Sequence, residues 1–143
     1  MRTQTKLLSG TALLAIVQLA HLLDVLRYSE TATFPSVLAD PVAMTGIFTA
    51  AAAFLAVATR QIFGTTAALL AGAAISLGFT LYHGLPINLG LNNPYWGSSG
   101  SNADFIQWAT VIAAIAIGAW TARVAWRAPS RDEDNPRILT EAV

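Results

Sequence analysis

Four long apolar stretches constrain the fold of this chain more than any other feature of its sequence. Each is about 18 to 20 residues long, and at about 1.5 Å of rise per residue a helix of that length nearly spans a bilayer core of roughly 30 Å. The sequence therefore predicts an all-α fold, an integral membrane four-helix bundle. The four predicted spans are Leu7–Leu26, Val42–Thr59, Phe63–Tyr82 and Phe105–Ala122.

The composition agrees with a membrane protein. Hydrophobic residues make up 55% of the chain and charged residues 11%, and the charged share is about half of that found in soluble domains. The chain has no cysteine, which excludes disulfide relays, thiolate metal sites and cysteine nucleophiles. A single lysine against seven arginines, with abundant alanine, is typical of a GC-rich bacterial genome. We therefore expect a protein of the bacterial plasma (inner) membrane.

Basic residues are distributed unevenly about the four spans. If all four cross the membrane, both termini lie on one side, and seven of the eight Lys and Arg residues lie there too, leaving only Arg27 opposite. Positive charge is retained in the cytoplasm during insertion, so we expect both termini to be cytoplasmic. The seven residues are Arg2, Lys6, Arg60, Arg123, Arg127, Arg131 and Arg137.

A short basic segment, Met1–Lys6, precedes the first apolar run, as it does in a cleaved signal peptide. The run is longer than the apolar region of a signal peptide, however. It also contains Gln18, His21 and Asp24, and no clear Ala-x-Ala cleavage site follows it. These features predict a retained first helix.

The chain is predicted to form one four-span transmembrane domain over residues 1–128, followed by a polar cytoplasmic tail over residues 129–143. Pro129 is expected to end the fourth helix, because proline cannot continue a helical hydrogen-bond ladder. Only Arg60 and Gln61 separate the second and third spans, which predicts a tight antiparallel helical hairpin.

Two longer connections are expected on the outer side, Arg27–Pro41 and His83–Asp104. Pro35 and Pro41 interrupt any helix in the first connection, and Pro41 suits the first position of the next helix. The second connection ends in Asp104, an acidic residue suited to the N-terminus of the fourth helix.

Small residues recur at four-residue spacing along the third and fourth spans. Residues four apart lie on one helix face, and small residues there let another backbone approach closely. Two alternatives follow: the third and fourth helices pack on each other, or these faces dock to a partner protein. For the second alternative the candidate partner-binding residues are Gly72, Ser76 and Gly118. The two rows are Ala68, Gly72, Ser76 and Thr80, and Thr110, Ala114, Gly118 and Ala122.

The chemically richest segment lies near the outer end of the first span, where Gln18, His21, Asp24 and Arg27 follow one another at three-residue steps. Such spacing keeps the side chains on one slowly rotating face. His21 is expected about 7 Å inside the outer boundary, where polar residues need a partner. Asp24 is positioned to accept a hydrogen bond from the His21 ring, which would leave the other ring nitrogen free to bind a ligand.

The only other histidine, His83, ends the third span in the same outer half of the bundle. One hypothesis makes His21 and His83 axial ligands of a haem, or ligands of a metal together with Asp24 and Asp40. The alternatives are a structural role, with the polar side chains hydrogen-bonded across helices, and proton handling. The sequence leaves all three open.

The outer loop between the third and fourth spans is rich in apolar and aromatic residues. Tyr95 and Trp96 are suited to a protein interface, because each combines a large apolar area with a polar atom. The alternative is that both rings lie among lipid headgroups. They are the remaining candidate partner-binding residues.

No set of residues in the sequence completes an acid, base and nucleophile arrangement. The basic residues follow the topology rule, so nucleic-acid binding has no support. We therefore expect a non-catalytic accessory or assembly subunit of a larger membrane complex, whose partners are the lipid bilayer and other integral membrane proteins. Two alternatives are a haem- or metal-binding redox subunit using His21 and His83, and a small oligomeric transporter or channel whose path is lined by Gln18, His21 and Asp24.

Overall fold

The computed structural model describes residues 3–28, 32–85 and 103–128 of the 143-residue chain, and in these ranges all regular structure is helical. Four of the helices are long and apolar enough to cross a membrane, which confirms the prediction of an all-α, multi-pass membrane protein. The fifth helix, α2, is short and has five residues. The elements are α1 (Thr3–Tyr28), α2 (Phe34–Leu38), α3 (Pro41–Ala58), α4 (Gly64–His83) and α5 (Phe105–Trp126).

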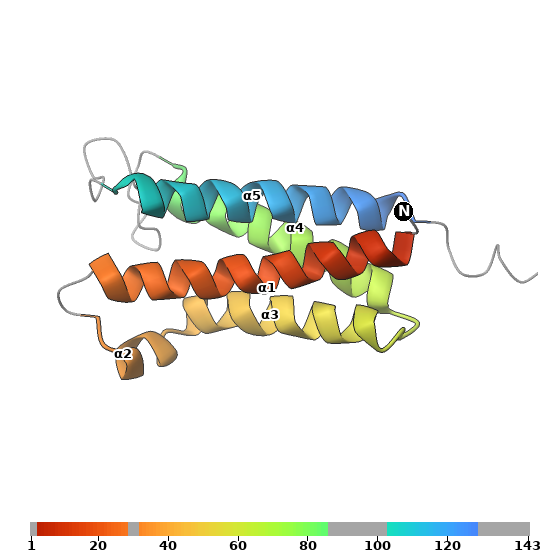
Figure 1. Ribbon diagram of the computed structural model, residues 1–143, viewed down its shortest axis with the longest axis horizontal. Coiled ribbons are helices and arrows are strands. Elements are labelled where there is room, and N and C mark those ends of the chain that lie inside the picture. The colour runs from red at the N-terminus through yellow and green to blue at the C-terminus, as the bar shows by residue number, and fades with distance from the viewer. Residues whose placement is uncertain (1–2, 29–31, 86–102, 129–143) are drawn as a thin grey trace, which may run out of the picture.

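The long helices lie side by side, alternating in direction, with α2 at the end where α1 finishes and α3 begins (Figure 1). Around the bundle, α1 contacts α3 and α5, and α4 contacts the same two helices, so the four form a closed ring. The first turn of α1 and the last turn of α5 lie at the same end. Lys6, Arg60, Arg123 and Arg127 lie toward that end, and Arg27 lies at the other.

Two helices run further than the apolar stretches that predicted them. The helix α1 continues beyond Leu26 to Tyr28, and α5 continues beyond Ala122 to Trp126, with Arg127 as its C-cap residue. An apolar run measures the length that lies in hydrocarbon. A helix ends instead where its backbone finds a cap, so polar turns at its ends are invisible to a hydropathy argument.

Local hydrogen bonds explain where two of the helices begin. The Asp40 carboxylate accepts from the amides of Val42 and Ala43 and starts α3 directly before Pro41. Asp104 starts α5 through a capping box with Gln107, whose side chain in turn accepts from the Asp104 amide. The expected starting positions of both helices are therefore confirmed.

The predicted tight hairpin between α3 and α4 is closed by Arg60 in the left-handed backbone region, with φ of 55°. The amide of Gln61 donates to Ala56 O and the amide of Arg60 donates to Val57 O. This pair of bonds is a Schellman motif, in which glycine usually occupies the position that Arg60 holds here.

The closest helix contact joins α4 and α5. A Cβ built on Gly72 would lie 2.6 Å from Gly118 O, and one built on Gly118 would lie 2.7 Å from Gly72 O and 3.0 Å from Ser76 Cβ. Each glycine therefore fills the space that a side chain on the other would need. Two alternatives were open for these small residues. In the structure they lie where α4 and α5 pack on each other, as the first alternative expected.

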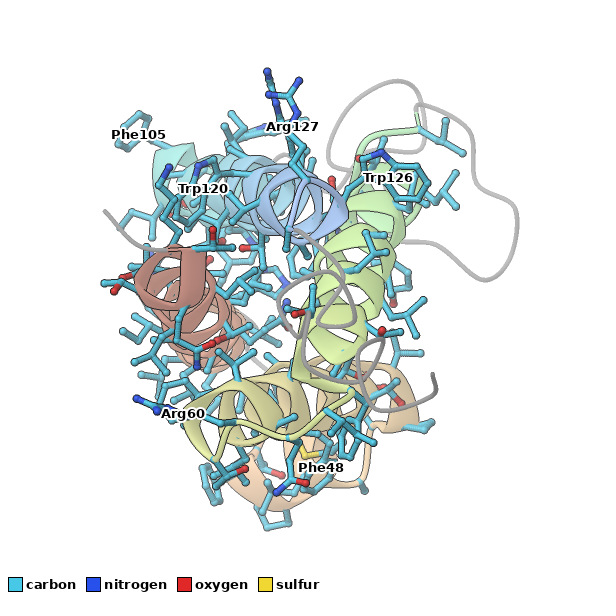
Figure 2. All side chains as sticks on the ribbon, turned by 90° about the vertical axis from the view of Figure 1, so that its right-hand side faces the viewer. Phe48, Arg60, Phe105, Trp120, Trp126 and Arg127 are labelled. Atoms are coloured by element: carbon cyan, nitrogen blue, oxygen red, sulfur yellow. The ribbon has the colours of Figure 1, made fainter. Side chains whose placement is uncertain are left out.

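Large apolar side chains cover the outside of the bundle. Phe48, Phe105 and Trp126 are 67%, 85% and 77% exposed, and Figure 2 shows Phe105 directed away from the helices. Exposed apolar patches of this extent are unusual in a soluble monomer but suit contact with lipid. The interior between α1, α3, α4 and α5 is filled by smaller residues, among them Leu14, Ala50, Ile75 and Ala114.

Candidate functional site

A cavity of about 800 Å³ lies between α1, α3 and α4, in the half of the bundle that carries α2. Its volume falls within the range of roughly 300 to 1,000 Å³ found for small-molecule sites. Residues from all five helices line it, because Val37 of α2 and Gln107 of α5 contribute beside the three main walls.

The cavity walls are mostly apolar. Leu22 and Val25 of α1, Ile47 of α3, and Ile75 and Phe79 of α4 supply aliphatic and aromatic surface. Such walls exclude water and favour an apolar occupant, with the few polar groups fixing its orientation.

Two glycines help to make the space. A Cβ built on Gly78 of α4 would have no heavy atom within 4 Å, so this position adds open volume beside the wall. A Cβ built on Gly46 of α3 would lie 2.6 Å from Gln18 Oε1, so glycine is what admits the Gln18 amide at this point. Neither residue belongs to the small-residue row that packs α4 on α5.

Exposed residues line the cavity in two places, at the end that carries α2, where Tyr28, Asp40 and Pro41 lie, and on the flank between α3 and α4. Its exposed lining residues on the long helices include Val42 and Thr45 on α3 and Ala74 and Gly78 on α4, whereas Gln18 and Leu22 on α1 are buried. When these helices span a membrane, this flank faces lipid.

His21 is held by a bond to another helix, not by Asp24 as the sequence suggested. Its Nδ1 lies 3.1 Å from Thr110 Oγ1 of α5. The single hydroxyl proton of Thr110 is donated to the Gln107 carbonyl at 2.9 Å, so Thr110 accepts and His21 Nδ1 donates. In a neutral imidazole this leaves Nε2 as an acceptor.

His21 and His83 lie in direct contact in the cavity wall. Their ring centroids are 5.2 Å apart in an edge-to-face arrangement, and Phe79 lies 4.9 Å from His21 and 5.7 Å from His83. Tyr82 completes the cluster at 4.8 Å from His83. The structure thus brings together the two histidines that the sequence placed in one half of the bundle.

The contact between the two imidazoles gives no support to a haem held between them. Opposite axial ligands lie on the two faces of a porphyrin, and rings that touch each other leave no room for its plane. Within the described ranges, no group of three or more His, Asp or Glu residues is arranged to hold a metal ion. A haem or metal bound by His21 and His83 therefore stays a prediction without a structural argument in its favour.

Gln18 is another polar residue in the cavity lining, and its side-chain nitrogen lacks a hydrogen-bond partner within the described ranges. Its side chain is 5% exposed, and its Nε2 atom has no hydrogen-bond partner among the residues that the structure describes. A buried amide donor without an acceptor is unfavourable, and native proteins leave few of them.

Asp24 and Arg27 lie at the edge of the site and bond to each other. Arg27 Nε donates to Asp24 Oδ1 at 2.8 Å, and Arg27 Nη2 donates to Asp104 Oδ2 at 2.6 Å. The amide of Gln107 and the Arg27 guanidinium hold the pKa of the Asp104 carboxyl below its ordinary value of 3.8. Because Gln18 and Asp24 are both buried inside one chain, the structure does not support a path between copies, and the channel hypothesis stays a prediction.

The remaining candidate residues lie elsewhere. Gly72, Ser76 and Gly118 are in the α4–α5 contact, on a different face of α4 from the cavity residues Ala74 and Gly78. Tyr95 and Trp96 lie outside the described residues, as does the tail over 129–143.

Four residues that shape the site were not singled out from the sequence, namely Gly46, Gly78, Phe79 and Gln107, and Thr110 was named only as a member of the small-residue row of the fourth span, not as the partner of His21. One available signal was Gln107, which stands three residues after Asp104 in the spacing of a capping box. The other residues belong to the site because of the helix face on which they lie. The sequence does not show which face of a helix meets its neighbours.

No family model matches this chain, no curated protein is significantly similar to it, and no solved structure matches it significantly. The functional argument therefore rests on the geometry of the cavity.

Proposed function

We propose that this chain is a non-catalytic membrane protein that binds a lipophilic small molecule in the cavity between α1, α3 and α4. The observation that carries the proposal is the cavity itself: about 800 Å³ in volume, walled mainly by apolar side chains, with exposed lining residues on the flank between α3 and α4. A molecule that partitions into lipid would reach it from the bilayer. Burial of apolar surface and a few hydrogen bonds would then hold it.

The hydrogen bonds of the site favour binding over catalysis. The nearest pair that resembles a nucleophile and its base is Thr110 and His21, 3.1 Å apart. The Thr110 proton is donated to a carbonyl of its own helix, so His21 is not placed to remove it. An activated hydroxyl requires the opposite arrangement, with the base accepting that proton.

The proposed setting is the plasma membrane of a bacterium, with both termini in the cytoplasm. The support is the distribution of basic residues, of which Lys6, Arg60, Arg123 and Arg127 lie toward one end of the bundle and only Arg27 toward the other. The cavity would then lie in the outer half of the membrane. A reporter that is active only outside the cytoplasm, fused after Val143, should be silent; its activity would overturn this orientation.

Native mass spectrometry tests the binding proposal. The full chain is purified in mild detergent from its own membrane, and the spectrum is searched for a co-purifying molecule at a fixed ratio to protein. The decisive variant is Gly78→Phe, whose ring would occupy the open space beside Gly78. The matched control is Gly78→Ala, which adds only a methyl group at the same position and leaves most of the volume.

A defined adduct is expected on the wild type and on Gly78→Ala, and its loss is expected on Gly78→Phe. Circular dichroism and gel filtration must show that Gly78→Phe remains folded and monodisperse; if it does not, Thr49→Phe, on the α3 wall of the cavity, serves as the second filling variant. A wild-type protein that carries no molecule, or an adduct that both filling variants retain, would overturn the proposal.

A second proposal is that the protein acts as an accessory or assembly subunit of a larger membrane complex. It is favoured by the exposed small residues Ala74 and Gly78 of α4. Small side chains at these positions would let a helix of another membrane protein approach α4 closely. Gentle purification followed by protein mass spectrometry tests it. A stoichiometric partner that is lost when Tyr95 and Trp96 are changed to Ala would support docking through the outer loop, and a protein that stays alone in several detergents would contradict it.

A further inference from the structure

We infer that the occupant of the cavity is a neutral isoprenoid quinone or its quinol, with the ring beside His21 and Phe79 and the tail directed to the flank between α3 and α4. This inference rests on the proposed binding function and names the chemical class of its ligand. Four observations support it: the charge of the lining, a donor without a partner, an available acceptor, and the aromatic wall.

The charge of the lining favours an uncharged head. The described lining residues include no Lys or Arg, and their one carboxylate, Asp40, accepts hydrogen bonds at the start of α3. A phosphate or carboxylate headgroup would therefore enter an apolar site without a counter-charge, which is costly. Phospholipids and fatty acids fit this cavity poorly for that reason.

The donor without a partner is Gln18 Nε2. It is buried against α3 beside Gly46, and no acceptor for it is present in the described part of the chain. This nitrogen has almost no accessible surface, so the Gln18 side chain must turn toward the cavity before a ligand oxygen can accept its hydrogen bond and satisfy it. Carbonyl and hydroxyl oxygens both do this, so the Gln18 amide can serve the quinone and the quinol.

The available acceptor is His21 Nε2. Because Nδ1 donates to Thr110, the remaining nitrogen carries a lone pair that can accept from a hydroxyl of the ligand. His21 and Gln18 are separated by one turn of α1 and both line the cavity. One acceptor and one donor on the same wall match a flat head that carries oxygen atoms, and the quinol form uses both.

The aromatic wall suits a planar ring. His21, Phe79, Tyr82 and His83 form a continuous cluster with centroid separations between 4.8 and 5.7 Å. Aromatic groups favour edge-to-face and offset contacts with a further ring. An isoprenoid tail would meet the aliphatic lining residues and leave through the flank where Ala74 and Gly78 are exposed.

Calorimetric titration of the delipidated full-length protein in matched detergent tests the inference. The probes are decylubiquinone and its reduced form, with dioctanoylglycerol as a neutral lipid without a ring. Saturable binding of decylubiquinone is expected on the wild type, tighter than binding of dioctanoylglycerol. The key variant is Gln18→Leu, which removes the unpartnered amide but keeps an apolar side chain of similar size.

Gln18→Leu should weaken decylubiquinone binding roughly three- to tenfold, the effect of losing one hydrogen bond to an uncharged group. Its melting temperature should not fall, because no hydrogen bond within the described chain is lost. His21→Phe keeps a ring in the wall and should weaken the quinol more than the quinone. The matched control is Leu70→Ala on the outer face of α4, which should leave both affinities unchanged.

The outcomes separate this inference from the function on which it rests. If the native protein carries an adduct that Gly78→Phe loses, but decylubiquinone does not bind or binds no better than dioctanoylglycerol, the quinone assignment is wrong and the binding function stands. If decylubiquinone binds equally to wild type and Gln18→Leu, the assigned hydrogen bond is wrong and with it the inference. If no adduct and no probe binds, both proposals fail together.

Discussion

Arg27 Nη2 lies 2.6 Å from Asp104 Oδ2, so the last turn of α1 is joined to the residue that caps α5. The same guanidinium lies 2.7 Å from Asp24 Oδ1. Arg27, the only Lys or Arg among the described residues at this end of the bundle, is therefore committed to two carboxylates on different helices. It compensates Asp24, which is buried, and fixes the ends of α1 and α5 beside the cavity.

Removing Arg27 should destabilise the protein chiefly by leaving Asp24 unpaired. Arg27→Ala is expected to lower the melting temperature in detergent, because an uncompensated buried carboxylate is more costly than no ion pair at all. In an Asp24→Asn background, which has no such charge, the same substitution should cost clearly less. A double-mutant cycle measured by thermal unfolding checks this, and strictly additive effects would show that the two residues do not interact.

The charge of Asp104 should contribute to stability in a pH-dependent way. Its pKa in the folded state is lowered by the Gln107 amide and Arg27, so its ionised form is bound more favourably in the folded than in the unfolded state. The contribution is fully present above the ordinary value of 3.8 and is lost as the pH falls through the lower folded value.

The test compares wild type with Asp104→Asn, since asparagine retains the ability to cap a helix but carries no charge. The wild type should be the more stable protein near neutral pH, and the difference in melting temperature should shrink once the pH falls below 3.8. A difference that is constant from neutral pH down to strongly acidic pH would contradict the assigned role of the charge.

Two glycines of α4 should respond oppositely to the same substitution. Gly72→Ala places a methyl group 2.6 Å from Gly118 O, and should lower the free energy of unfolding by about 1 to 3 kcal/mol because a backbone must move. Gly78→Ala meets open space, and should leave that free energy unchanged or raise it by up to about 1 kcal/mol, since alanine favours helix. Reversible unfolding in mixed micelles measures the free energy of unfolding of both variants. Equal changes in the two variants would show that Gly72 is not at a close contact between α4 and α5.

The spans and their order could be predicted from the sequence because bilayer thickness fixes the length of an apolar run. The start of α5 at Asp104 and the hairpin at Arg60 were also predictable, since capping and short connections depend on residues adjacent in sequence. Such features need no knowledge of which helix lies beside which. The membrane sidedness of the bundle still rests on the charge distribution alone.

The site was harder to predict because its contacts join residues distant in sequence. Thr110 lies 89 positions from the histidine that it binds, and a threonine in an apolar span gives no sign of that role. The sequence placed Arg27 three residues after Asp24 and identified Asp104 as a helix start, but it gave no sign that Arg27 bonds to Asp104. The cavity could not be predicted for a further reason. Gly78 leaves open space and Gly46 admits the Gln18 amide, each by lacking a side chain, and such glycines have the same sequence pattern as one that packs a helix.

Photo-crosslinking inside the native membrane tests most directly whether a specific molecule occupies the cavity. A benzophenone side chain is introduced by Val42→benzoylphenylalanine, at the exposed edge of the cavity on α3, and separately by Leu70→benzoylphenylalanine on α4. The two positions are similarly exposed, at 59% and 63%, but only Val42 lines the cavity.

After irradiation, intact-protein mass spectrometry identifies what each position has captured. A bound occupant predicts one dominant adduct of defined mass at position 42, reduced when Gly78→Phe fills the cavity, and a mixture of bulk lipid adducts at position 70. The same lipid mixture at both positions, unchanged by Gly78→Phe, would show that the cavity holds only the surrounding bilayer and would contradict the proposed function.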